Sequence, residues 1–337
     1  MDAKRTLLVV VGPTGVGKTE TALRLAERYE CPIVNADSRQ VYREIPIGTA
    51  APTEEEQRRV KHYFVGTRSL REDYNAGMYA RDATEVLNRL YEQAVKDTKQ
   101  DPKELGKEAK DTEKTAEATD GEAWKPFAIL TGGSMLYIDA VCRGLDDIPK
   151  TDEVTRRRVQ EGYRERGLEW LQQEVQKRDP SYWQEVDRQN PQRLMHCLEV
   201  CLTTGQPYST YRTGMAEPQH PWRVVTVGLE REREELYERI NRRVEQMMAA
   251  GLEAEARSVY ELRHLNSLNT VGYKEMFQYI DGQLTREEAI RMIQQNSRHY
   301  AKRQMTWYRR QNDIKWLQAT WDYETQLEFI DTCLRTA

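Results

Sequence analysis

The feature that most constrains the fold is the octapeptide GPTGVGKT at residues 12–19, which directly follows the apolar run LLVVV. It fits the pattern GxxxxGK[ST], in which backbone N–H groups turn inward on a phosphate and the lysine adds a point charge. The apolar run predicts a buried strand over 5–11, and TETALRLAERY predicts a helix behind the loop. A glycine loop between a strand and a helix N-terminus suits an anion. The sequence therefore predicts a polyphosphate site.

The whole octapeptide is assigned to the phosphates. Its members are Gly12, Pro13, Thr14, Gly15, Val16, Gly17, Lys18 and Thr19. The hydroxyl of Thr19 is the candidate ligand for Mg²⁺, the cation that commonly accompanies bound polyphosphates. The pattern does not say which polyphosphate is bound.

Strand and helix patterns alternate through much of the chain. CPIVNAD (31–37), PFAILTGG (126–133) and PWRVVTVGL (221–229) predict strands, and SMLYIDAVCRGL predicts a helix. This alternation indicates an α/β fold with a parallel sheet and helices on both faces. Such sheets bind ligands at the carboxyl ends of their strands, where the glycine loop, Asp37 and Gly132–Gly133–Ser134 are all expected.

Composition divides the chain into three predicted parts. Residues 1–147 form the α/β core, 148–220 an inserted helical domain that is charged and rich in arginine, and 221–337 a largely helical return to the core. Within the first part, residues 96–122 carry six lysines and nine acidic residues and almost no large apolar side chain. Such a segment cannot offset its ordering entropy by burial, so we expect a mobile surface insertion.

Bulk composition excludes several classes of protein. No run of about 20 apolar residues is present, so we expect no membrane span. Five cysteines occur without a CxxC pair, which indicates a reducing, cytoplasmic setting and no structural zinc. Cys197 and Cys201 lie one helical turn apart and are interpreted as core residues. The net charge of −4 does not by itself indicate a nucleic-acid-binding protein.

Asp37 is the one acidic residue that ends a predicted strand near the phosphate loop. It could hold Mg²⁺, act as a general base or cap a helix. An NTPase usually has an apolar strand that ends in an aspartate reaching the Mg²⁺, and PFAILTGG has none. Support for ATP hydrolysis is therefore mixed.

Six stretches, in this order, resemble bacterial tRNA dimethylallyltransferases over nearly the whole chain. They are GPTGVGKT, NADSRQVYREIPIGTAAP, LTGGSMLYIDAVCRGL, NPQRLMHCLEV, VGYKEM and AKRQMTWYRR. The resemblance implies that the loop binds the diphosphate of dimethylallyl diphosphate. It also implies transfer of the five-carbon group to N6 of the adenosine 3′-adjacent to the anticodon. The implied partners are the tRNA anticodon stem-loop and dimethylallyl diphosphate with Mg²⁺, and we expect a monomer.

The resemblance also assigns three catalytic residues. Asp37 accepts the proton of the attacking amine, and Ser134 stands where the family usually has threonine, with its hydroxyl kept. RINRRVEQM resembles a family helix that places Arg243 at the diphosphate. From the residues alone, Arg242 and Arg243 could equally be solvated charges on a helix.

Two polar stretches are candidates for the tRNA surface. In 190–205, Asn190 caps a helix that ends at Gly205, and its polar residues lie opposite an apolar arc. RHYAKRQMTWYRR (298–310) interleaves basic and aromatic residues, which suits RNA but equally suits an amphipathic helix. The residues assigned to tRNA are Asp37, Ser38, Arg39, Gln40, Ser134, Gln192, Arg193, Leu194, Met195, His196, Gly272, Tyr273, Lys274 and Arg303.

Three other functions would each fit part of the sequence. A nucleotide or small-molecule kinase would use 148–220 as a lid, and the phosphate loop and Asp37 would suit it equally. A non-catalytic, ATP-dependent RNA-binding protein would not need Asp37. An adenylate isopentenyltransferase, which uses a free nucleotide, would leave the helical insertion with nothing to hold. The C-terminus DTCLRTA lacks the Cys/His zinc element of eukaryotic relatives, so the bacterial type is favoured.

Overall fold

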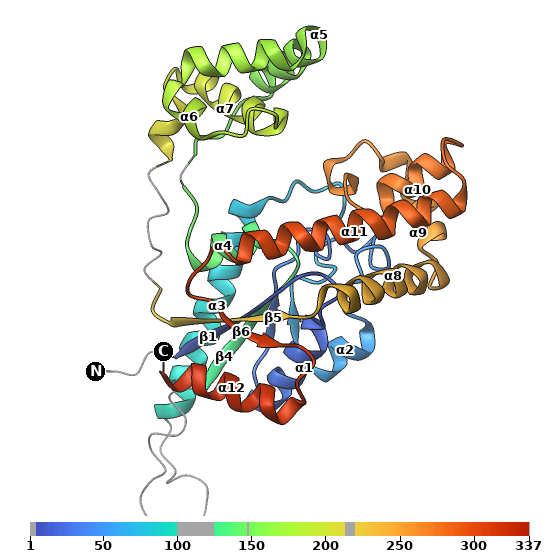
Figure 1. The fold of residues 1–337 in the computed structure, drawn as a ribbon. Coiled ribbons are helices and arrows are strands. Elements are labelled where there is room, and N and C mark those ends of the chain that lie inside the picture. The colour runs from blue at the N-terminus through green and yellow to red at the C-terminus, as the bar shows by residue number, and fades with distance from the viewer. Residues whose placement is uncertain (1–4, 100–124, 147, 213–219, 337) are drawn as a thin grey trace, which may run out of the picture. The chain divides into compact units, whose positions relative to one another are not determined.

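The computed structural model describes residues 5–99, 125–146, 148–212 and 220–336. Most of the predicted insertion at 96–122 lies outside the described residues, and its first four positions end a helix. The chain divides into two compact units, Met1–Cys142 with Gln219–Ala337 and Arg143–Pro218, which are described separately (Figure 1). The sequence predicted the helical part over 148–220, so the second unit begins five residues earlier.

The first unit is built on a six-stranded parallel sheet. Its strands are β1 (Thr6–Val11), β2 (Ile33–Asn35), β3 (His62–Tyr63), β4 (Pro126–Thr131), β5 (Arg223–Glu230) and β6 (Lys315–Gln318). Their order is β3-β2-β4-β1-β5-β6, which confirms the predicted α/β class. The four predicted strands are β1, β2, β4 and β5. The edge strands β3 and β6 were missed because two and four residues are too short to show a strand period.

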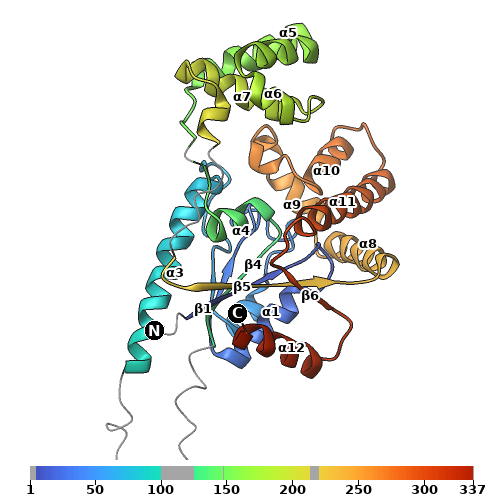
Figure 2. The same cartoon turned by 60° about the vertical axis from the view of Figure 1, so that its left-hand side comes forward.

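Both faces of the sheet are covered by helices (Figure 2). Alternate side chains of β1 point to opposite faces, so Leu8 and Val10 join one core and Leu7, Val9 and Val11 the other. The first core contains side chains of α1 (Lys18–Tyr29) and α12 (Tyr323–Thr336). The second contains side chains of α3 (Ala76–Lys99) and α4 (Met135–Cys142). Burial on both faces explains why β1 is apolar at every position from Leu7 onward.

A third core cluster supports the loop that follows β2. The loop contributes Val41, Tyr42 and Ile45, which pack against helices near the C-terminus. Those helices are α8 (Arg233–Ala249), α9 (Leu252–Ser258), α10 (Tyr273–Ile280) and α11 (Arg286–Tyr308). The remaining short elements of this unit are α2 (Glu54–Arg59), η3 (Tyr260–Leu262) and η4 (Asn266–Leu268).

The second unit is helical, with its own core. Its elements are α5 (Glu153–Arg178), α6 (Pro180–Glu185), α7 (Pro191–Thr204) and η2 (Tyr208–Tyr211). The predicted ends of α7 are confirmed: the Asn190 side chain accepts from the Arg193 N–H, and Gly205 ends the helix at φ 72°. α5 bends at Gly167, whose φ of 74° favours glycine and interrupts the helical backbone.

Candidate active site

The phosphate loop connects the end of β1 to the start of α1. Gly12, Gly15 and Gly17 all have positive φ values, and Gly17 is the N-cap of α1 without a side-chain cap. Lys18 folds back over the loop, and its Nζ donates to the carbonyl oxygens of Gly12 and Pro13 at 2.9 Å each. The loop thus presents an uncapped helix N-terminus together with a lysine amine, which is the arrangement expected for binding an anion.

The amine of Lys18 has an unusual pKa. Burial, and secondarily the positive charge of Arg243, lower the pKa of Lys18 to about 7, although Asp37 opposes the shift. The same burial lowers the pKa of Arg243, with Asp37 and Glu56 opposing. Two cations held together in a desolvated site disfavour each other's charge, and a bound polyanion would relieve that cost.

We expect Lys18 to take up a proton when inorganic diphosphate binds. With a pKa of about 7, much of Lys18 is neutral at pH 8, and a neighbouring anion favours the ammonium form and raises the pKa. Affinity should therefore fall as pH rises from 7 to 9. Calorimetry in two buffers of different ionisation enthalpy measures the number of protons taken up on binding. The number measured for Lys18→Met gives the protons that diphosphate itself exchanges, and it is subtracted from the wild-type value. Equal uptake by wild type and Lys18→Met would contradict the expectation.

Asp37 follows β2, and backbone donors on two loops hold its carboxylate. Oδ1 accepts from the N–H groups of Arg39 and Gln40 at 2.8 and 3.2 Å, and Oδ2 accepts from the Gly133 N–H at 3.2 Å. A Cβ on Gly133 would collide with Oδ2, so glycine is needed for this approach. Three N–H donors fix the orientation of the carboxylate. Asp37 thus caps a turn, and not a helix as one of its predicted roles required, and it is also a preorganised carboxylate.

Ser134 binds the same turn from the start of α4. Its Oγ accepts from the Ser38 N–H at 2.8 Å and donates to the Ser38 Oγ at 2.9 Å, while its own N–H donates to the Ala36 carbonyl at 3.0 Å. The Ser134 hydroxyl therefore contacts the residue that follows Asp37, and this contact links the end of β2 to the end of β4. The structure gives Ser134 a positioning contact with the turn that carries Asp37.

Helix α8 contributes two arginines to the phosphate loop. An Nη of Arg243 donates to the Thr14 Oγ1 at 3.3 Å, and the Nε of Arg239 donates to the Gly15 carbonyl at 2.9 Å. Arg242 is exposed. Arg243 therefore lies against the phosphate loop and is not a solvated charge, while its role at the diphosphate stays a prediction. Arg239, which the sequence analysis missed, contacts the same loop. The buried residues Leu236 and Ile240 each lie three positions before one of these arginines, a helical spacing that could have identified both.

Helix α11 adds two residues that were not predicted, Tyr300 and Gln304. The Gln304 side chain connects the Thr14 N–H with the Gly133 carbonyl, and the Tyr300 hydroxyl donates to that same carbonyl. Farther along, the indole of Trp307 donates to Asp139 on α4, and Tyr308 is fully buried. The aromatic side chains of 298–310 therefore serve packing and loop contacts, which favours the amphipathic-helix interpretation. The sequence signal that could have identified Gln304 is its place among the apolar residues of one face of α11.

The residues predicted to contact tRNA divide by exposure. Exposed side chains are Gln192, Arg193, His196, Lys274 and Arg303, and partly exposed ones are Asp37, Ser38, Arg39, Gln40 and Ser134. The assignment of Leu194, Met195, Gly272 and Tyr273 needs correction, because these four are buried. Leu194 and Met195 lie on the apolar face of α7 and fill the core of the second unit. Short motifs of consecutive residues include positions from both faces of a helix, so only some can be exposed.

Tyr273 has an internal role in place of the predicted one. It is fully buried, and its hydroxyl donates to the carboxylate of Glu255 and contacts the Ile45 carbonyl. The same carboxylate accepts the N–H groups of Ile47 and Gly48 at 2.8 and 2.7 Å. This group therefore fastens residues 45–48, which follow the Asp37 turn in the chain.

Removing the Tyr273 hydroxyl should loosen that loop. A hydrogen bond to a charged group contributes about 1.5–3 kcal/mol, so Tyr273→Phe should speed amide exchange in residues 45–48 by about 10- to 100-fold. Hydrogen exchange read by mass spectrometry over that peptide measures the change. Tyr260→Phe is the matched control, since the Tyr260 hydroxyl bonds Asp281 at the surface. Equal effects of the two variants on residues 45–48 would contradict the assignment.

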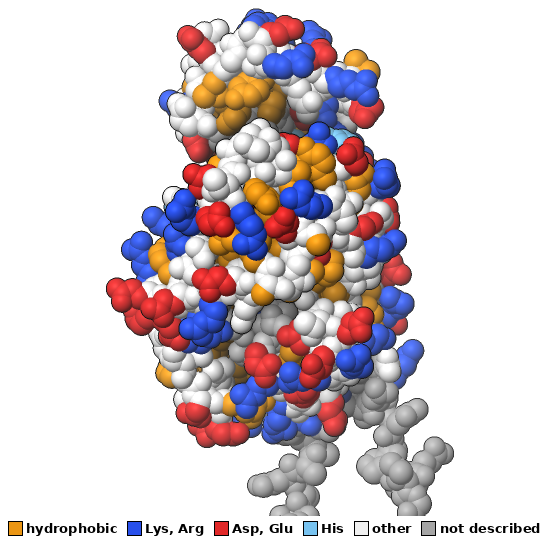
Figure 3. Space-filling view, turned by 90° about the vertical axis from the view of Figure 1, so that its right-hand side faces the viewer, with side chains coloured by type: hydrophobic (Ala, Val, Ile, Leu, Met, Phe, Trp, Pro, Cys, Tyr) orange, Lys and Arg blue, Asp and Glu red, His pale blue; other side chains and the backbone are white. Residues whose placement is uncertain are grey.

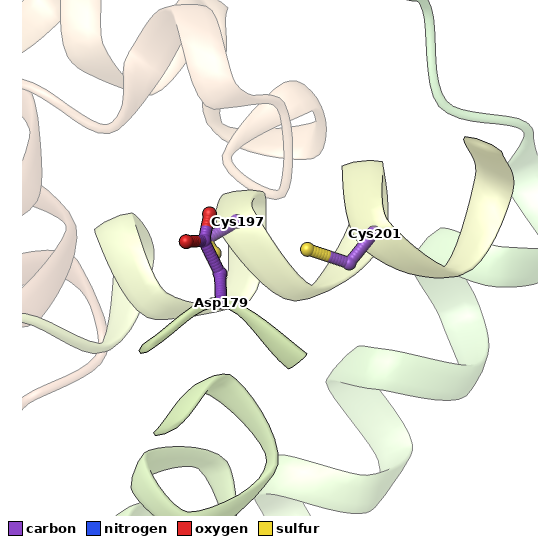
Figure 4. A group of neighbouring side chains, drawn as sticks. All are labelled: Asp179, Cys197 and Cys201. Carbon is purple, nitrogen blue, oxygen red and sulfur yellow. The ribbon is translucent and has the colours of Figure 1, made fainter. Parts of the chain in front are cut away.

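One group of side chains in the described residues lies close enough to hold a metal ion: Asp179, Cys197 and Cys201 (Figure 4). The Asp179 carboxylate already accepts the Tyr182 N–H at 2.9 Å, capping α6, and both the N–H and the hydroxyl of Ser209. The cysteines are buried in the core of the second unit, as predicted. We therefore assign this group to the internal structure of the unit.

Comparison with known proteins supports what these loops suggest. A model of the IPP transferase family matches residues 40–96 and 108–311. A protein of Porphyromonas gingivalis named tRNA dimethylallyltransferase 2 is 48% identical over 325 residues, covering 96% of this chain and 98% of its own. The chain belongs to the IPP transferase family. The resemblance seen in the sequence is thereby confirmed, and the nucleotide-kinase alternative gains no support.

Other IPP transferases and their structures agree. A Bacteroides thetaiotaomicron protein named tRNA dimethylallyltransferase 1 is 48% identical over 311 residues, covering 92% of this chain and 91% of its own. The crystal structure of a tRNA isopentenylpyrophosphate transferase from Bacillus halodurans is 32% identical, with a TM-score of 0.65 over 98% of this chain and 97% of its own. A eukaryotic dimethylallyltransferase acting on tRNA, 20% identical, shares the fold with a TM-score of 0.71 over 97% of this chain and 78% of its own.

Two surface properties complete the description. Among the described residues, no helix combines the length and apolar character needed to span a membrane. On the face shown in Figure 3, basic and acidic side chains are interspersed among the described residues. That face therefore shows no large field of basic side chains among the described residues.

Proposed function

We propose that the chain transfers the dimethylallyl group from dimethylallyl diphosphate to N6 of the adenosine 3′-adjacent to the anticodon of tRNA, releasing diphosphate. One observation carries the proposal. The loop after β4, through Gly133, reaches both the Asp37 carboxylate and a side chain that binds the phosphate loop. An anion site and a fixed carboxylate thus share one framework at the carboxyl ends of the parallel strands. The reaction needs both, because an anion leaves and a proton is lost.

The leaving group is the task of the phosphate loop. As the C–O bond of the allylic ester breaks, its electron pair passes to the diphosphate, whose oxygens gain negative charge. Lys18, Arg243 and the N-terminus of α1 are cations or dipoles that stabilise this charge. Mg²⁺ fits here through the exposed hydroxyl of Thr19 on the first turn of α1, and when bound it would neutralise diphosphate oxygens.

The attacking amine is the task of Asp37. The new bond forms between N6 and the allylic carbon, and the amine must then lose a proton. Asp37 Oδ1 already accepts two backbone N–H groups, whereas Oδ2 accepts one and keeps a lone pair, so Oδ2 is the atom that can accept this proton. Ser134, through Ser38, keeps the turn in place.

The tRNA contacts are proposed for the exposed and partly exposed side chains. The turn 37–40 and Ser134 would receive the flipped acceptor base, since that base must leave its stack to reach the strand ends. Arg303 and Lys274 in the first unit and Gln192, Arg193 and His196 in the second unit would contact the anticodon stem-loop. We further propose that the enzyme acts as a cytoplasmic monomer.

The test uses the purified protein, Mg²⁺ and an unmodified tRNA that carries the target adenosine. Dimethylallyl diphosphate is added to one sample and ATP to another, and the tRNA is digested to nucleosides for mass spectrometry. We expect adenosine heavier by one five-carbon prenyl unit only in the first sample. The control tRNA has guanosine at the target position and should gain nothing. No added mass on either tRNA, with ATP consumed in the second sample, would overturn the proposal.

A further inference from the structure

The buried side chain of Gln304 joins the two loops that carry the reacting groups. It is fully buried on α11, its Oε1 accepts the Thr14 N–H at 2.8 Å, and its Nε2 donates to the Gly133 carbonyl at 2.8 Å. Thr14 belongs to the phosphate loop after β1, and Gly133 to the loop after β4. One amide therefore spans the carboxyl ends of two neighbouring strands.

Gly133 passes this connection on to Asp37. Its carbonyl accepts from Gln304 and, at 2.7 Å, from the Tyr300 hydroxyl one helical turn earlier, while its N–H donates to Asp37 Oδ2. Donor and acceptor belong to one residue, so a change in its backbone angles would move both. The chain of contacts runs from Thr14 through Gln304 and Gly133 to Asp37.

We propose that Gln304 and Tyr300 are positioning residues that set the spacing between the phosphate loop and the Asp37 carboxylate. This inference rests on the proposed function, because the allylic carbon must lie between the diphosphate and the amine that Asp37 deprotonates. A misplacement of about 1 Å can cost about 10²-fold in rate. The two loops belong to separate strands, so a rigid third element is the natural means of fixing their separation.

A second buried glutamine in the same unit, Gln326, has a purely structural role and can be compared with Gln304. Gln326 on α12 is also buried, but its Nε2 donates to the carbonyl of Trp321, five residues earlier, and so serves its own helix start. Gln304 makes both of its contacts with distant functional loops. Gln326→Met is therefore a matched control for Gln304→Met.

The experiment measures two quantities on active protein. Calorimetry with inorganic diphosphate and Mg²⁺ gives the dissociation constant and the stoichiometry, and single-turnover transfer at saturating substrates gives the rate of the chemical step. For Gln304→Met we expect a dissociation constant about 10-fold higher, since the loop loses a hydrogen bond, and a transfer rate about 10²-fold lower at unchanged stoichiometry. Gln326→Met should leave both quantities within about twofold of wild type.

Tyr300→Phe separates the two ends of the connection. It removes a donor to Gly133 and, among the hydrogen bonds of the described residues, none to the phosphate loop, so the transfer rate should fall about 10-fold with an unchanged dissociation constant for diphosphate. This variant keeps the ring and decides the question alone if Gln304→Met does not fold. A transfer rate equal to wild type for Tyr300→Phe would then overturn the inference.

Two further outcomes are informative. If Gln304→Met lowers only the stoichiometry, its remaining sites being fully active, the glutamine is merely structural and the inference fails. If wild type transfers no prenyl group, the proposed function has failed instead. In that case an unchanged dissociation constant for diphosphate in Gln304→Met also overturns the connection to the phosphate loop.

Discussion

Replacing Asp37 with asparagine should lower the single-turnover rate of prenyl transfer by about 10²- to 10⁴-fold, the usual contribution of a positioned general base. The amide oxygen can still accept the N–H groups of Arg39 and Gln40, which now bind Oδ1, so the turn should persist. The amide nitrogen takes the place of Oδ2, so it can accept neither the Gly133 N–H nor the proton of the attacking amine. The rate is measured from prenylated adenosine by mass spectrometry after rapid quenching, with tRNA and dimethylallyl diphosphate saturating.

The control for Asp37→Asn is the same substitution at another capping aspartate. Asp322 accepts the N–H and the hydroxyl of Thr325 at the start of α12 and is exposed. Asp322→Asn should therefore leave the transfer rate within about twofold. The tRNA dissociation constant of Asp37→Asn should change much less than its rate. A variant that keeps more than a tenth of the wild-type rate would remove Asp37 from the role of base and leave it as a turn cap.

Replacing Arg243 with alanine should lower the transfer rate by about 10²- to 10³-fold, the range seen when one preorganised donor to a developing anion is removed. Its guanidinium reaches Thr14 in the phosphate loop and is largely desolvated, so it acts on the leaving diphosphate with little screening. The same variant should also raise the pKa of Lys18, because a neighbouring positive charge is lost. Rates and diphosphate affinities between pH 6 and 9 measure both effects.

Arg242→Ala is the matched control, since Arg242 is the preceding residue of the same helix and is exposed. It loses the same side chain without touching the loop, so the transfer rate should stay within about twofold. Equal losses in the two variants would indicate a general electrostatic effect on tRNA binding. Such an effect would weaken with added salt for both, whereas the loss in Arg243→Ala should persist.

Helix α8 shows how much of the site can be predicted from the sequence. The spacing from Leu236 and Ile240 already places Arg239 and Arg243 beside the buried stripe of α8 and Arg242 away from it. Spacing therefore gives the direction of a side chain around its own helix. It does not give what lies opposite, because the phosphate loop is more than 200 residues away in the chain.

The sequence by itself determined the phosphate loop, four strands of the parallel sheet, the ends of α7 and the acidic residue beside the loop. All of these depend on local rules: glycine spacing, runs of apolar residues and helix caps. Only the tertiary structure decided that Gln304 joins Thr14 to Gly133, that Tyr273 is internal and that the Gly133 N–H reaches Asp37. These contacts join residues that are far apart in the chain, and they form only when the strands and helices that carry them pack together.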